Sequence, residues 1–105
     1  MLDTLNYEEL AAQVNTKFLV TEMADPFELE LIEATERRIT PSQEVFSLIF
    51  LGPKDLLLPQ RMYQLAHARL GDGVLFLVPI EHSETGVKYE AAFNRLINPA
   101  DFKRD

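Results

Sequence analysis

The sequence predicts a mainly β fold, a six-stranded antiparallel barrel or roll with a short N-terminal α-helix. Beyond the first helix the hydrophobic pattern changes from a helical period to a period of two, and no further helical segment intervenes. Residues 45–51 and 74–81 are apolar on both faces, so a flat sheet would leave one apolar face in water. Curling the strands into a barrel buries one face of each strand and removes most free edges.

The length of 105 residues predicts a single domain, 1–105, that can bury one core without a metal or a disulfide. We expect a helix over about 6–14, a β region over about 17–95 and a C-terminal tail over 96–105. Hydrophobic residues make up 47% of the chain and charged residues 26%, which are ordinary values for a folded domain.

The N-terminal helix is indicated by one apolar stripe and by its first turn. Asn6 and Glu9 have the spacing of a capping box, in which side chain and backbone bond reciprocally. Because nine residues are too few to hold a helix in water, the stripe must dock, either at one end of the barrel or across its outside. The stripe residues are Tyr7, Leu10, Ala11 and Val14.

The predicted strands lie in the segments 17–23, 26–37, 43–51, 62–70, 74–81 and 87–95. The alternation of apolar residues slips near Leu31 and Ile32, which indicates a bulge or a strong bend. Pro79 has no N–H to donate, so its strand meets an edge or a bulge there. A hairpin turn is predicted at Gly71–Asp72–Gly73. One face of 45–51 is expected inside the barrel, and the other under the helix, the tail or a neighbouring subunit.

Composition excludes several classes of function. The chain has no cysteine, which excludes disulfides, thiolate zinc sites and a cysteine nucleophile. The net charge is −7, and residues 1–36 hold nine acids and one base, which is the wrong sign for a nucleic-acid binder. No apolar run is long enough to span a membrane, and the acidic N-terminus does not resemble a signal peptide. We therefore expect a cytoplasmic protein without nucleic-acid or membrane partners.

Glu28 and Glu30 project to one strand face, and we expect Asp25 and Glu36 nearby. Such a cluster is either a solvated surface or a landing site for a basic partner. The calcium-loop motif and the phosphate-loop spacing are both absent, so the sequence predicts no metal and no cofactor.

His67 and His82 are the only histidines. His67 shares the parity of apolar positions in its strand, which favours a structural role, although an enzyme using His67 and nearby carboxylates remains the alternative. His82 stands beside Ser83 and Glu84, but a triad is defined by geometry and the sequence shows no nucleophile elbow.

Leu56, Leu57 and Leu58 are three successive leucines between two prolines. They are candidates for an exposed partner-binding patch. Alternatively, they form a loop that folds over the mouth of the barrel.

The segments "FSLIFLGP", "LPQRMYQLAHARLG", "LFLVPIE" and "YEAAFNR" occur in an order that resembles a family of small bacterial proteins of unknown function. The similarity spans about residues 7–95. The resemblance implies that the gene lies beside those of phage-tail-collar-like fibre proteins, and hence an accessory or assembly role.

These observations together predict a non-catalytic interaction or assembly module with a protein partner, which is either a phage-tail-like or fibre-like protein or a second copy of the chain. The alternative is a small-ligand-binding barrel. A binding barrel needs a cavity of roughly 300 Å³ or more with convergent polar groups. An interaction module needs a filled interior and an apolar patch or open strand edge outside.

Overall fold

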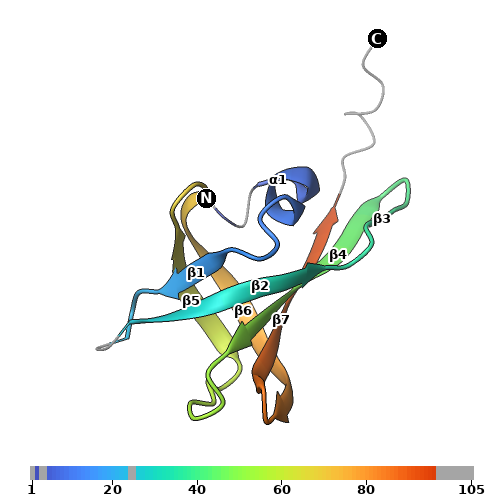
Figure 1. The fold of residues 1–105 in the computed structure, drawn as a ribbon. Coiled ribbons are helices and arrows are strands. Elements are labelled where there is room, and N and C mark those ends of the chain that lie inside the picture. Colours follow the sequence, from blue (N-terminus) through green and yellow to red (C-terminus); the bar gives the residue numbers. More distant parts are fainter. Residues whose placement is uncertain (1, 3–4, 24–25, 97–105) are drawn as a thin grey trace.

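The computed structural model describes residues 2, 5–23 and 26–96 and confirms a mainly β fold with one short N-terminal helix (Figure 1). The elements in chain order are α1 (Tyr7–Ala11), β1 (Lys17–Val20), β2 (Phe27–Ala34), β3 (Arg38–Ile39), β4 (Gln43–Gly52), β5 (Arg61–His67), β6 (Gly71–Ser83) and β7 (Gly86–Leu96).

Six strands close into an antiparallel barrel in the order β2-β1-β5-β6-β7-β4, and β4 pairs back to β2. β3 pairs only with the first residues of β4, where β4 and β7 run on beyond the barrel (Figure 1). This two-residue strand was not predicted, because two residues are too short to show a period.

The capping box of α1 is present as predicted. The Oδ1 of Asn6 accepts a hydrogen bond from the Glu9 N–H at 2.8 Å, and the Asn6 N–H donates to Oε1 of Glu9 at 3.1 Å. The predicted extent of 6–14 is wrong, because α1 ends at Ala11. Residues 12–15 turn instead, with Asn15 at a φ of 76°, and the Asn15 N–H donates to the Leu31 carbonyl. Docking onto β2 therefore replaces the last turn of the helix.

Both predicted irregularities of the strands are confirmed. The β2–β4 register shifts between Leu31 and Glu33, and the β6–β7 register shifts between Pro79 and Glu81. The predicted turn at 71–73 is wrong, since the chain turns at residues 68–70 and β6 already begins at Gly71.

The barrel interior is filled by inward side chains from all six of its strands. The largest are Tyr63, Tyr89, Phe18, Phe46 and Phe50. Figure 1 shows α1 at one end of the barrel and the β4–β5 loop at the other. Among the described residues, no buried side-chain nitrogen or oxygen lacks a hydrogen-bond partner. The core is thus closed at both ends.

β4 shows which of its faces is covered. Phe46, Leu48 and Phe50 point inward and are buried, so theirs is the face that lies inside the barrel. Of the two placements expected for the helix, the structure shows the one at an end of the barrel, because Tyr7 of α1 packs on inward-facing Phe46, with ring centroids 5.0 Å apart. On the outer face Val45 is 40% exposed. The tail that was the other predicted cover lies outside the described residues beyond Leu96.

Candidate functional site

The β4–β5 connection, residues 53–60 and here the leucine loop, closes one end of the barrel. The Tyr89 hydroxyl accepts a hydrogen bond from the Leu58 N–H at 2.9 Å and donates to the Leu56 carbonyl at 3.2 Å. The Tyr63 hydroxyl donates to the Pro59 carbonyl at 2.6 Å. Burial raises the pKa of both phenols, so they stay protonated near neutral pH. The loop is therefore held down by two side chains of the core.

The predicted leucine patch needs a correction. Leu58 is only 1% exposed and belongs to the core, so it cannot contact a partner. Leu56 and Leu57 are 39% and 54% exposed and remain available on the outside of the loop. The mouth-covering interpretation thus holds for Leu58, and the patch interpretation survives for two of the three leucines.

His67 has a structural position at the end of β5. Its Nδ1 accepts hydrogen bonds from the N–H groups of Arg69 and Leu70, at 3.1 and 3.2 Å. The other nitrogen, Nε2, lies 2.8 Å from Oγ1 of Thr16, whose own proton goes to the Gln13 carbonyl. Since Nδ1 accepts, the ring is neutral with its proton on Nε2.

The environment of His67 is apolar. The ring is 7% exposed and lies 4.4 Å from that of Phe18, centroid to centroid. Burial, and secondarily the charge of Arg69, lowers the pKa of the imidazole. Within the described part of the chain, its hydrogen-bond partners are a hydroxyl and two backbone groups and include none of the carboxylates that the enzymatic alternative requires.

His82 and its neighbours do not form a triad. Nε2 of His82 lies 3.0 Å from the Lys54 carbonyl oxygen in the leucine loop. The Ser83 hydroxyl lies 2.9 Å from that of Thr85, within the β6–β7 turn. Both contacts join loops at this end of the barrel. Neither of them places a base beside the Ser83 hydroxyl.

Glu28 and Glu30 do share the outer face of β2, as predicted. Lys17 faces Glu30 across the β1–β2 ladder, and its Nζ lies 3.9 Å from Oε1 of Glu28. Asp25, the third member of the predicted cluster, lies outside the described residues. Because one base stands between the two acids, the local field on a basic partner is weaker than the sequence indicates.

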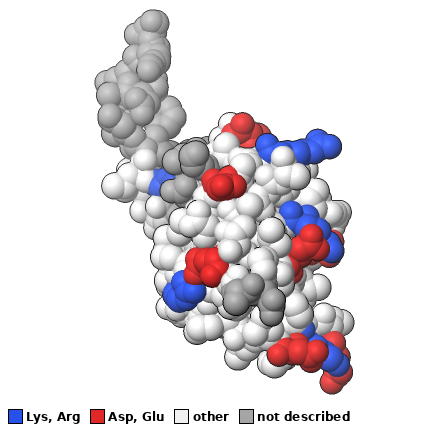
Figure 2. Space-filling model, turned by 90° about the vertical axis from the view of Figure 1, so that its left-hand side faces the viewer, with Lys and Arg blue, Asp and Glu red and all other residues white. Residues whose placement is uncertain are grey.

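Other acids of the N-terminal third also have basic neighbours. Glu8 pairs with Arg37 at 3.0 Å, and Glu22 pairs with Arg61. On the face drawn in Figure 2, acidic side chains lie next to basic ones, and uncharged surface separates these groups from one another. In the folded protein, acids that are concentrated in the N-terminal third of the sequence therefore lie beside basic side chains. Over the described part of the chain, no group of three or more His, Cys, Asp or Glu side chains could hold a metal ion.

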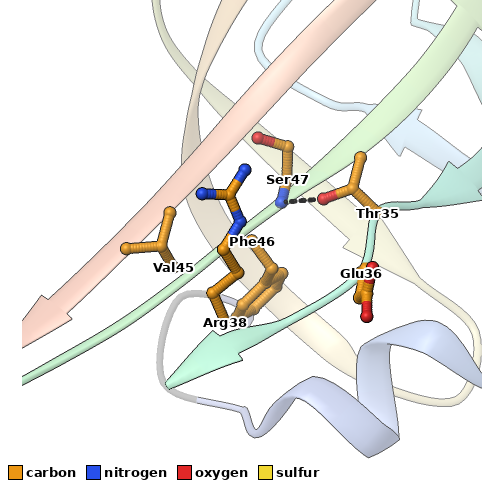
Figure 3. Close-up of a pocket in the computed structure, with 6 residues that line it drawn as sticks. All are labelled: Thr35, Glu36, Arg38, Val45, Phe46 and Ser47. Carbon is orange, nitrogen blue, oxygen red and sulfur yellow. Dashed lines mark hydrogen bonds between the residues drawn. The ribbon is translucent and has the colours of Figure 1, made fainter. Parts of the chain in front are cut away.

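A hollow of about 370 Å³ lies where β2 ends and β3 joins β4. Its polar groups are partly engaged: the Ser47 N–H donates to Oγ1 of Thr35 at 2.8 Å, and the Ser47 hydroxyl donates to Glu90 at 2.6 Å. Figure 3 shows the Arg38 side chain extending toward Ser47. Arg38 and Glu36 are both exposed on the rim. The volume suits a small ligand, but the polar groups do not converge on one point.

A second hollow, of about 230 Å³, lies between β6 and β7. The ladder between these strands starts at the Ser83–Gly86 pair and stops at the Val78–Glu90 pair. Beyond it, residues 73–77 of β6 and 91–95 of β7 diverge (Figure 1). We call this gap the seam. It was not predicted from the sequence, although Pro79, which interrupts the ladder, was the available signal.

Apolar side chains surround the seam. Met62 on β5 and Phe76 on β6 are register partners on the outer face, and they are 51% and 42% exposed. The hollow is lined by Met62, Val74, Leu75, Phe76, Ala91, Ala92, Phe93, Asn94 and Arg95. The seam therefore combines an apolar surface with a stretch in which β6 and β7 are no longer register partners.

Residues 5–93 match the family DUF6916, described as a domain of unknown function. No curated protein and no solved structure matches the chain. No helix in the described part of the chain has the length and apolar character needed to cross a membrane.

Proposed function

Since the chain belongs to the DUF6916 family, a domain of unknown function, we propose its function from its own geometry: a non-catalytic protein-interaction or assembly module. Its partner is a fibre-like or phage-tail-like protein of the kind that the sequence resemblance implies, in the cytoplasm where such particles are assembled. The proposal rests on one observation: the barrel interior is filled, while its outside carries exposed apolar side chains.

The packing of the interior supports this function over a small-ligand-binding barrel. Tyr63 and Tyr89 reach from the core to the leucine loop, and Leu58 fills the mouth between them. A barrel that carries a ligand keeps a cavity at this position instead. The larger hollow lies outside the barrel, beside β3, where its polar groups do not converge.

The exposed apolar side chains support protein contact. Met62 and Phe76 form one patch beside the seam, and Leu56 and Leu57 stand on the leucine loop. Exposed aromatic and methionine side chains are enriched at protein interfaces.

The test is binding between the purified chain and a purified fibre-like protein of the kind that the sequence resemblance implies, measured by biolayer interferometry. Light scattering over a concentration series, on the chain alone, reports self-association. We expect saturable binding to the fibre-like protein. A chain that stays monomeric at every concentration and shows no binding to the fibre-like protein contradicts the proposal.

A further inference from the structure

We propose that the chain forms a symmetric dimer through the outer face of the sheet that projects beyond the barrel, with Arg38 of each copy paired to Glu36 of the other. The inference goes beyond the proposed function, because it names a second contact, between two copies of the chain, that does not involve the fibre-like partner. It assigns the surface, the symmetry and the two residues that determine self-recognition.

The surface belongs to three paired strands that project beyond the barrel (Figure 1). We call this part the arm, and it consists of residues 38–39 of β3, 43–47 of β4 and 92–96 of β7. On its outer face Arg38 lies opposite Val45, and Val45 lies opposite Asn94. Leu96 follows Asn94 by two residues and therefore shares this face. Val45 and Leu96 are 40% and 83% exposed, so the outer face of the arm offers apolar surface for contact.

Arg38 and Glu36 have no charged partners in the described part of the chain. Both side chains are exposed, and neither forms an ion pair with a described residue. Arg37, which stands between them in the sequence, reaches toward α1 and pairs with Glu8 and Glu44. The chain contains more acids than bases, and yet no described carboxylate compensates Arg38. The folded monomer thus presents one cation and one anion for a contact with another molecule.

The two charges lie on different sides of the hollow of about 370 Å³. In Figure 3 the Arg38 side chain extends toward Ser47, whereas the Glu36 side chain points away from that of Arg38. The neighbouring acid, Glu90, accepts a hydrogen bond from the Ser47 hydroxyl at 2.6 Å, so Glu36 is the acid that is left for a partner. One group of a small ligand cannot meet two charges that point apart, but a surface that carries both signs can.

A second copy of the chain supplies such a surface. Across a two-fold axis, two different residues that meet do so twice, once on each side of the axis. A cation and an anion that stand close together on one face are therefore self-complementary. Arg38 meets Glu36 of the partner subunit, and Glu36 meets Arg38 of the partner subunit. Val45 lies opposite Arg38 in the ladder, so its exposed side chain enters the same contact.

Charge complementarity also favours a second copy over a partner of one sign. A basic partner would place a base opposite Arg38, and an acidic partner would place an acid opposite Glu36, whereas a second copy compensates both. The net charge of −7 opposes association of two copies. At physiological ionic strength the screening length is about 8 Å, so acids on the other faces of the barrel contribute little, and the charges within the contact decide.

The experiment measures the monomer–dimer equilibrium by sedimentation velocity over a concentration series, at about 0.15 M salt. The variants are Arg38→Glu, Glu36→Arg and the double variant that carries both changes. Arg69→Glu is the matched control for the change of charge. Arg69 is exposed and has no ion-pair partner among the described residues, but it lies in the turn between β5 and β6, outside the arm. All substituted sites are exposed, so the variants should fold, which circular dichroism verifies.

We expect the wild type to dimerise. Arg38→Glu or Glu36→Arg alone should raise the dimer dissociation constant about tenfold or more, because the symmetry replaces two ion pairs by two like-charge contacts. The double variant exchanges the charges and restores both pairs, and an equimolar mixture of the two single variants restores them in a heterodimer. Both should associate like the wild type, as should Arg69→Glu.

A wild type that stays monomeric at every concentration would overturn the inference, as would a dimer that both single variants leave intact. An equal loss in Arg69→Glu, or a loss that neither the double variant nor the mixture restores, would also overturn it. Binding to the fibre-like protein separates this failure from that of the proposed function. Should a monomeric wild type still bind the fibre-like protein, the interaction function stands and the arm is not a surface for self-association.

Discussion

The Nε2 of His67 lies 2.8 Å from Oγ1 of Thr16, which joins the end of β5 to the start of β1 across 51 residues of sequence. The other ring nitrogen accepts two backbone N–H groups of the β5–β6 turn. The imidazole thus hydrogen-bonds to three polar groups at this corner of the barrel: the Thr16 hydroxyl and the N–H groups of Arg69 and Leu70. A protonated ring would turn Nδ1 from an acceptor into a donor facing two donors.

Stability should therefore depend on pH through His67. Burial, and then the charge of Arg69, lowers the pKa of His67 from its ordinary value of 6.5. As the pH falls through about 6.5, the unfolded chain takes up a proton that the folded chain does not, so the free energy of unfolding decreases until the pH passes below the folded pKa. Urea unfolding between about pH 7 and pH 5 measures the slope.

The variants His67→Gln and Thr16→Val separate titration from hydrogen bonding. His67→Gln removes the titrating group and should flatten the slope over this range. Thr16→Val keeps the imidazole and should keep the slope, while lowering stability by about 1–2 kcal/mol through the lost hydrogen bond. A His67→Gln slope equal to that of the wild type would show that other groups set the pH dependence.

The features that were predicted correctly depend on patterns of residues that are close together in the sequence. The barrel follows from strands apolar on both faces, and the bulges follow from the slipped alternation at Leu31–Ile32 and from Pro79. The extent of α1 was overestimated because the apolar stripe continues to Val14, whereas a tertiary bond from Asn15 to Leu31 ends the helix. A one-dimensional pattern does not contain that bond.

The candidate site was less predictable for the same reason. Leu56, Leu57 and Leu58 are identical in sequence terms, whereas the fold holds the loop backbone on Tyr89 and buries only Leu58. The seam depends on where β6 and β7 part, which is a property of the pairing of two strands. His67 was predicted as structural from its parity, but its partner Thr16 is remote in the chain.

Leu58 and Leu57 should respond very differently to truncation. Leu58→Ala removes a core side chain under the loop and should lower the free energy of unfolding by about 2–5 kcal/mol. Leu57→Ala, one residue earlier and 54% exposed, should change it by less than about 0.5 kcal/mol. Chemical denaturation of the two variants in parallel measures both values. Equal losses would mean that the loop does not plug the barrel.

Even the smallest side chain at Gly73 should lower the free energy of unfolding. A Cβ at this position would overlap the backbone of Leu2, which packs against β6 from the inside and is fully buried. Gly73→Ala should therefore cost about 1–3 kcal/mol. Deleting residues 1–4 should remove most of that additional cost, because the clashing atoms are then gone.

Gly71→Ala is the control for Gly73→Ala. Its Cβ would meet no neighbour within 4 Å, but its φ of +88° strains any L side chain. We expect a cost of about 1–2 kcal/mol from the backbone alone, and this cost should be the same with and without residues 1–4. If deletion rescued both glycine variants equally, the clash with Leu2 would not be the cause.

Tyr7 should decide whether α1 acts as the cover of the barrel end. Its ring meets Phe46 edge to face, its hydroxyl donates to the Thr35 carbonyl at 3.0 Å, and the Arg37 guanidinium lies 5.3 Å from the ring centre. Tyr7→Phe removes only the hydroxyl and should cost about 1 kcal/mol. Tyr7→Ala removes the edge-to-face contact with Phe46 and should cost about 2–4 kcal/mol, since Tyr7 is only half-buried.

Dye binding to newly exposed aromatic surface provides a second measurement of the role of Tyr7. Phe46 stacks on Phe93 at 4.6 Å, so uncovering one ring opens an aromatic pair to solvent. Tyr7→Ala should therefore bind an apolar fluorescent dye under native conditions, whereas Tyr7→Phe should not. α1 has only five residues and depends on docking, and fully buried Leu10 is its other anchor, so loss of Tyr7 should loosen the helix at its start. Dye binding that is identical for the two variants would mean that other residues close this end of the barrel.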